Sequence, residues 1–177
     1  MNMSELLKKL ETYADSDYLP MHMPGHKRRM GDLGNPFFID ITEIDGFDDL
    51  HHAEGILKQA EERAAELYGS EETHYLVNGS TSGILASISG CTAAGGTVLL
   101  ARNSHKSAYH AVLLRGLHVH YIYPQPAGKM GINGPVTAEN VDRLLEEHPE
   151  TKMVYITSPT YDGVVSDVEQ IAEVVHR

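Results

Sequence analysis

Short apolar runs alternate with helical patterns through most of this sequence. Four runs have the length of buried strands, and they lie at residues 73–77, 97–100, 118–122 and 153–156. Between them, the spacing of apolar side chains predicts helices at residues 81–92, 105–115 and 137–148. Nearly continuous apolar strands that alternate with helices are typical of parallel sheets. We therefore expect an α/β fold, in which a mainly parallel sheet carries helices on both faces.

The first third of the chain has a different pattern. Amphipathic spacing predicts a helix at residues 4–14 and a second helix that begins near Leu57 and ends at Gly69. Residues 19–50 show no periodicity and contain prolines and glycines that forbid long regular elements. Their apolar side chains argue against disorder, so we expect an N-terminal helix and an ordered, extended arm over residues 1–50, wrapping a neighbouring subunit.

Composition limits the partners of the chain. It has 14 Lys and Arg against 25 Asp and Glu, a formal net charge of -11, so we expect no nucleic-acid partner. No apolar run is long enough to cross a membrane, and residues 1–10 lack the apolar centre of a signal peptide, which favours the cytoplasm. The single cysteine, Cys91, excludes an intrachain disulfide, and we expect it to be a buried small hydrophobe.

The last residues predict one more helix. Ser166 and Glu169 have the spacing of a capping box, and an apolar face continues from Val168 to Val175. A crossover helix normally leads to a further parallel strand, and none follows Arg177. We therefore expect the sequence to be a fragment of a longer chain.

A turn rich in Gly and hydroxyl groups is the first candidate site. Residues 78–83, Asn-Gly-Ser-Thr-Ser-Gly, lie between an apolar run and a predicted helix. A helix start of this kind presents backbone N–H groups to an anion such as phosphate, and the same residues also serve as a plain cap. From the pattern alone the two interpretations are equally favoured. The Walker and dinucleotide motifs are absent, which argues against ATP and NAD.

Two further polar segments follow predicted strands. Residues 101–107 contain His105, and residues 157–163 follow the last strand. Because ligands of parallel sheets bind beyond the carboxyl ends of strands, we expect these segments and the 78–83 turn to form one site for a phosphorylated cofactor. We interpret Lys106 as a solvated helix-start residue that is not linked to the cofactor.

Other polar clusters have simpler interpretations. His105 and His110 are five residues apart, which does not stack them on a helix, and His118 and His120 have no carboxylate or thiol near them in sequence. We therefore expect no metal site. The acidic residues Asp45, Asp48 and Asp49 beside His51 and His52 are more simply explained as a solvated loop than as an acid/base cluster.

Five ordered motifs together resemble the Orn/Lys/Arg decarboxylase family. That family consists of pyridoxal-phosphate enzymes with the aspartate aminotransferase-like fold, fold type I. The resemblance covers nearly the whole chain from about residue 18 onward. The motifs are Met-Pro-Gly-His-Lys at 23–27, Thr-Glu-Ile-Asp-Gly-Phe-Asp-Asp-Leu at 42–50, Val-Asn-Gly-Ser-Thr-Ser at 77–82, Ala-Arg-Asn-Ser-His-Lys-Ser at 101–107 and Ser-Pro-Thr-Tyr-Asp-Gly at 158–163.

The resemblance implies an activity and assigns roles to residues. It implies decarboxylation of arginine, lysine or ornithine, as in polyamine biosynthesis, by a homodimer or larger homo-oligomer that uses pyridoxal 5'-phosphate. Ser80 and Thr81 match the residues that hold the cofactor phosphate, and Gly79 lets the backbone approach it. His105 matches the histidine that stacks on the cofactor ring and is the one catalytic candidate.

The same resemblance assigns the other segments more loosely. Residues 160–163 match a loop near the cofactor, and residues 23–27 match a segment near the active-site entrance or subunit interface. Residues 51–177 match the N-terminal part of the family's large, cofactor-binding domain.

Two expected motifs are missing from these 177 residues. The family's cofactor-linking lysine lies in a Ser-x-His-Lys motif, and its ring-nitrogen partner lies in an Asp-Glu-Ala-type strand, and the sequence contains neither. We therefore expect the chain alone to be inactive. Two alternatives stay open: another fold type I enzyme, such as an aminotransferase or a carbon-sulfur lyase, and a non-catalytic binding or assembly domain.

Overall fold

The computed structural model describes residues 5–21, 26–27 and 34–177. The chain divides into two compact units, residues 1–73 and 74–177. None of the helices in the described ranges is long and apolar enough to cross a bilayer.

The first unit contains two α-helices and one short turn of 3-10 helix. Helix α1 spans Glu5–Ala14, the turn η2 spans Pro36–Phe38, and α2 spans Ile56–Tyr68. Gly69 ends α2 in the left-handed conformation, with φ 66°, and its N–H closes the last turn. Both helices were predicted from the sequence, and so was the lack of long elements in the arm, which is confirmed for its described residues.

Asp48 caps the start of α2 from a distance. The N-cap residue, Gly55, has no side chain to accept a hydrogen bond. Instead, the Asp48 carboxylate accepts hydrogen bonds from the backbone N–H of Gly55 at 2.7 Å, of Leu57 at 3.0 Å and of Glu54 at 3.0 Å. These backbone N–H donors, of which that of Glu54 has the largest effect, lower the pKa of Asp48 from 3.8 to about 2. Asp48 is therefore a structural residue as well as a loop residue, a capping role that the interpretation as a solvated loop did not include.

Removing the Asp48 charge should loosen the start of α2. In an Asp48→Asn variant we expect several-fold faster hydrogen exchange at the amides of Gly55 and Leu57, measured by NMR at neutral pH. A depressed pKa stabilises the folded state above the unfolded pKa. The same amides of the unmodified protein should therefore lose protection as the pH falls from 3.8 towards 2. Asp45→Asn, which changes an exposed neighbour, is the matched control, and equal protection in both variants would contradict the assignment.

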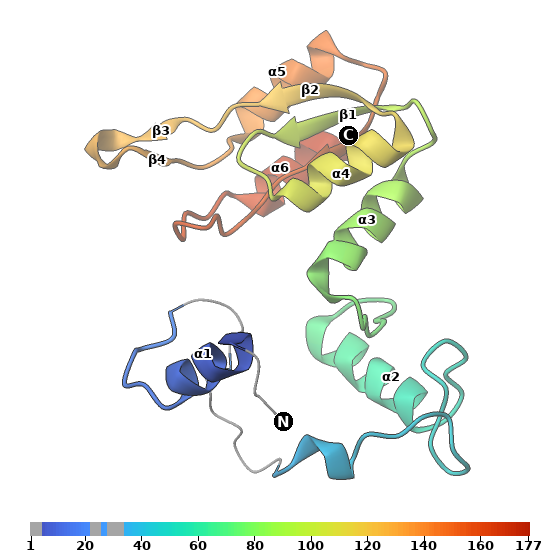
Figure 1. The fold of residues 1–177 in the computed structure, drawn as a ribbon. Coiled ribbons are helices and arrows are strands. Elements are labelled where there is room, and N and C mark those ends of the chain that lie inside the picture. The colour runs from blue at the N-terminus through green and yellow to red at the C-terminus, as the bar shows by residue number, and fades with distance from the viewer. Residues whose placement is uncertain (1–4, 22–25, 28–33) are drawn as a thin grey trace. The chain divides into compact units, whose positions relative to one another are not determined.

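The second unit is built on a three-stranded parallel sheet in the order β2-β1-β5 (Figure 1). Strand β1 spans Thr97–Ala101, β2 spans His118–Ile122 and β5 spans Thr151–Tyr155. These strands fall on three of the four predicted runs. Every residue of the central strand β1 is buried, and the chain returns between parallel strands through helices.

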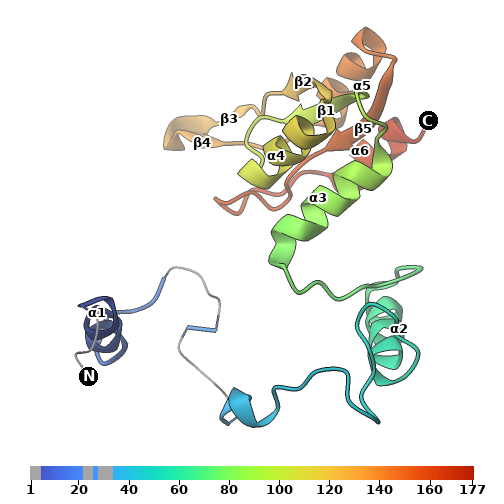
Figure 2. The same ribbon diagram turned by 45° about the vertical axis from the view of Figure 1, so that its right-hand side comes forward.

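Helices cover both faces of the sheet, as predicted. Helix α3 spans Gly79–Cys91, α4 spans Lys106–Arg115, α5 spans Ala138–Glu147 and α6 spans Val168–Val175. Val98 and Leu100 face the core under α3 and α4, while Leu99 and Ala101 face the core under α5 and α6 (Figures 1 and 2). Because side chains alternate along a strand, one strand supplies both cores.

The predicted strand at residues 73–77 does not form. Residues 73–77 pair with none of the described strands, and Leu76 instead packs beside Gly83 of α3. A strand exists only where a partner satisfies its backbone, and β propensity does not supply that partner. A small hairpin was missed, because its strands β3, Pro126–Ala127, and β4, Ile132–Asn133, are too short to show a period. The 3-10 turn η3, Gly128–Met130, lies between them.

Two local predictions also need correction. Cys91 is exposed, because the face of α3 that contains Ile88 and Thr92 is buried and Cys91 lies beside it. Ser166 does not cap α6. The N-cap is Asp167, which accepts from Gln170 N, whereas the buried Ser166 hydroxyl accepts from Val136 N at 3.0 Å. A partner 30 residues away makes Ser166 a tertiary link between the segments that precede α5 and α6.

Candidate active site at the start of two helices

The start of α3 has the form of an anion site. Asn78 is the N-cap but makes no side-chain capping bond, and Gly79 adopts φ 69°, a conformation that favours glycine. Ser80 and Thr81 are exposed in the first turn, and the Ser82 hydroxyl donates to Gly79 O at 2.8 Å. With no side-chain cap, the first backbone N–H groups of α3 are available to an anion, and the helix dipole favours negative charge there.

His105 begins α4, and its ring is held in place by Ser107. The imidazole Nδ1 accepts from Ser107 N at 3.2 Å and lies 2.8 Å from the Ser107 hydroxyl. Ser107 is buried, so a packed residue sets the orientation of an otherwise exposed ring. Lys106 is exposed next to it, in agreement with a solvated helix start.

The loop before His105 contains two unsatisfied polar atoms. Asn103 Oδ1 and Ser104 Oγ are buried, and neither has a hydrogen-bond partner in the described part of the chain. Buried polar atoms are normally paired, and unpaired ones mark places where a ligand or a water completes the network. The residues present at this loop therefore fit a polar cofactor beside His105.

The structure places Ser80 and Thr81 in the first turn of α3 and His105 at the start of α4. Helices α3 and α4 pack along one another on one face of the sheet, and both run against the direction of β1 (Figure 1). Within the described residues, no hydrogen bond joins Ser80 or Thr81 to His105. The 157–163 loop follows β5 at the carboxyl edge, where Thr160 accepts from Val164 N at 3.1 Å. Of the 23–27 segment, residues 23–25 lie outside the described part.

Sequence reasoning missed a cluster of one arginine and two tyrosines, Arg102, Tyr109 and Tyr121, that begins three residues before His105. Arg102 Nη1 donates to the Tyr109 hydroxyl at 2.8 Å, and that hydroxyl donates to Arg102 O at 2.6 Å. The Arg102 guanidinium also lies 5.5 Å from the Tyr109 ring centre and 5.6 Å from that of Tyr121. The cluster fixes the loop after β1 against α4 and β2. Its members come from three elements, so no local pattern could have revealed it.

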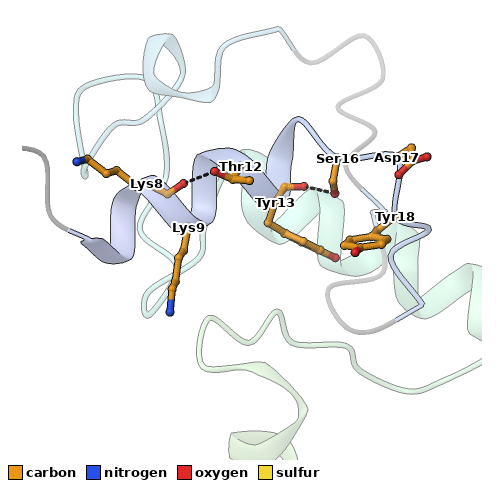
Figure 3. A pocket seen from close by; sticks show the side chains of 7 residues that line it. All are labelled: Lys8, Lys9, Thr12, Tyr13, Ser16, Asp17 and Tyr18. Carbon is orange, nitrogen blue, oxygen red and sulfur yellow. Dashed lines mark hydrogen bonds between the residues drawn. The ribbon is translucent and has the colours of Figure 1, made fainter.

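A hollow in the first unit contains none of the predicted cofactor residues. It measures about 640 Å³ and is formed by α1 and the residues just after it, among them Tyr13 and Tyr18 (Figure 3). The hydroxyls that line it bond to the local backbone: Thr12 donates to Lys8 O and Ser16 donates to Tyr13 O. Two of its hydroxyl groups therefore already donate hydrogen bonds to the backbone of the same segment.

Comparisons with known proteins identify the family. The sequence matches the Orn/Lys/Arg decarboxylase family, major domain, over residues 4–177. It is 38% identical to the uncharacterized protein YaaO of Bacillus subtilis, over 97% of this chain and 37% of that protein. It is 34% identical to an arginine decarboxylase of the same organism, over 94% of this chain and 36% of that protein. The solved structure of lysine decarboxylase A from Pseudomonas aeruginosa is 26% identical, with a TM-score of 0.63, over 93% of this chain and 25% of that one.

The matches cover nearly all of this chain but only part of each relative. It spans little more than a third of the length of the curated relatives named above. The parallel sheet with helices on both faces agrees with the fold of pyridoxal-phosphate enzymes of fold type I. The chain therefore belongs to the Orn/Lys/Arg decarboxylase family, and residues 4–177 match the major domain of that family.

Proposed function

We propose that this chain is the cofactor-binding part of a pyridoxal-phosphate-dependent decarboxylase that acts on a basic amino acid. The observation that carries the proposal is the family match over residues 4–177. Arginine is the first substrate to test, because the relative at 34% identity is an arginine decarboxylase and the lysine decarboxylase is 26% identical.

In this proposal the first turn of α3 holds the cofactor phosphate. The uncapped N–H groups donate to the phosphate oxygens, and the exposed Ser80 and Thr81 hydroxyls add further donors. Gly79, with no side chain, lets the backbone approach the phosphate closely. These residues bind and orient the cofactor without transferring a proton.

His105 orients the cofactor ring. Its imidazole, held by Ser107, offers a flat face against which an aromatic ring stacks. Pyridoxal phosphate, when bound, accepts the electron pair that is released as carbon dioxide leaves the substrate. His105 would hold the plane of a bound cofactor ring, so its contribution would be alignment, and the paired Arg102 would keep its loop rigid.

We propose further that the arm mediates subunit contact. Phe37 and Phe38 are 82% and 88% exposed, and Ile39 is 62% exposed. Three adjacent apolar side chains in water are unfavourable, and burial against a second subunit would remove that cost. This supports a homo-oligomer, as expected for the family.

The phosphate assignment predicts a loss that depends on the phosphate. A Ser80→Ala/Thr81→Ala double variant should bind pyridoxal phosphate about tenfold more weakly or worse, because it loses hydrogen bonds to a charged group. Its affinity for pyridoxal, which lacks the phosphate, should stay close to that of the unmodified protein. Equilibrium dialysis with both compounds measures the two affinities. Ser87→Ala, at an exposed position of the same helix, is the matched control. Equal losses for both compounds would exclude a phosphate role.

The stacking assignment predicts different effects for two His105 variants. His105→Ala should weaken the binding of pyridoxal phosphate by about two- to tenfold, since an aromatic pair contributes ~0.5–1.5 kcal/mol. His105→Phe keeps a flat ring and should retain most of the affinity, whereas Lys106→Ala should leave it unchanged. Absorbance titration of the cofactor follows all three proteins. A Phe variant as weak as the Ala variant would contradict stacking.

Because these residues contain no Ser-x-His-Lys motif, we expect them to bind the cofactor without catalysing decarboxylation. We expect the 177-residue polypeptide to bind pyridoxal phosphate but to release no carbon dioxide from arginine, lysine or ornithine. Release of labelled carbon dioxide from each carboxyl-labelled amino acid tests this. Measurable release would refute it, while failure to bind the cofactor would favour a non-catalytic assembly domain.

A further inference from the structure

A second cluster of reactive side chains lies in the 74–177 unit, outside the proposed cofactor site. His120 lies in β2, His148 is the C-cap of α5, and Glu150 immediately precedes β5. One nitrogen of each ring and one carboxylate oxygen all lie within 4.8 Å of one another. The two histidines are half-buried and the glutamate is exposed, so solvent reaches the cluster.

The fold holds these three groups together. His148 N donates to Leu144 O at 3.0 Å, and Thr151 N donates to His148 O at 3.0 Å, which fixes the tight turn that carries His148 and Glu150. His120 pairs in register with Leu99 of β1 and therefore faces the same side of the sheet as α5. The two imidazoles stack at 3.4 Å between ring centres, with 14° between their planes.

The ring nitrogens are not used in hydrogen bonds. Glu150 Oε1 lies 3.8 Å from His120 Nε2 and 3.8 Å from His148 Nδ1, which is too long for a hydrogen bond. Neither ring has any other hydrogen-bond partner among the described residues. One carboxylate oxygen is thus equidistant from two imidazole nitrogens. Each nitrogen offers a lone pair to a metal in the tautomer that carries the proton on the other ring nitrogen.

We propose that His120, His148 and Glu150 bind a divalent transition-metal ion, with Zn²⁺ the best match. Imidazole and carboxylate are ligands that Zn²⁺ accepts, and two histidines with one glutamate form a known three-ligand set. Bonds of about 2.0–2.2 Å to a tetrahedral ion place ligand atoms roughly 3.3–3.6 Å apart. Each 3.8 Å separation needs to shorten by a few tenths of an ångström, and the stacked rings need to open so that both nitrogens point to the ion.

This site is separate from the proposed cofactor site and does not rest on the proposed function. Thr151, next to Glu150, pairs with Thr97 at the amino end of β1, whereas His105 follows the carboxyl end of β1. The ion would join β2, α5 and β5, elements that are up to 30 residues apart in sequence. It would therefore stabilise the folded chain, because the unfolded chain does not present the three ligands together.

The test uses the chelator-treated protein and zinc sulfate in a calorimetric titration. We expect one equivalent of Zn²⁺ to bind and the melting temperature to rise, with reversal by added chelator. His120→Gln and His148→Gln should each weaken binding by at least about tenfold, because each loses one of only three protein ligands. His110→Gln, which changes an exposed histidine of α4, should bind as the unmodified protein does.

A second measurement does not depend on how the variants fold. In the unmodified protein, Zn²⁺ should shift the ring NMR signals of His120 and His148 together, at the same metal concentration, and leave that of His110 in place. The proposal fails if these two rings do not respond, or if a His120→Gln/His148→Gln variant that melts as the metal-free protein does binds Zn²⁺ with unchanged affinity.

Discussion

The buried central strand β1 is the element on which the second unit depends. It pairs in parallel with β2 on one side and with β5 on the other, and none of its residues is exposed. Its alternating side chains fill two separate cores, one with Val98 and Leu100 and the other with Leu99 and Ala101. A parallel sheet requires crossover connections, so the same pairing forces helices onto both faces and turns all three carboxyl ends to one edge.

The two proposed sites lie near opposite ends of β1. The carboxyl end of β1 leads into the loop with Asn103, Ser104 and His105, where buried polar atoms have no partner in the described chain. Near the amino end of β1, the turn into β5 carries Glu150 beside His148 and His120. The proposed cofactor residues were named from the family resemblance, whereas the proposed metal ligands were not. His120, His148 and Glu150 lie together because a strand and a turn that are distant in sequence meet beside the sheet.

Sequence patterns were reliable where the deciding contacts are local. Gly69 ends α2 in the left-handed conformation, as predicted, and β2 begins and ends as the apolar run predicts. His105 was also placed correctly, at the start of a helix. Patterns failed where a distant partner decides. Residues 73–77 have strand-like composition but pair with none of the described strands, and Ser166 bonds to Val136 instead of capping α6.

The sequence alone determined the α/β class, the family and the identity of the proposed cofactor residues, because short periodicities and contiguous motifs encode them. The tertiary structure decided three other matters. It gave Asp48 the amides of α2 to cap, set Arg102 against two tyrosine rings, and brought His120 to His148 and Glu150. Each of these contacts joins residues from different elements. Their distances depend on how strands pair and helices pack, which no local pattern specifies.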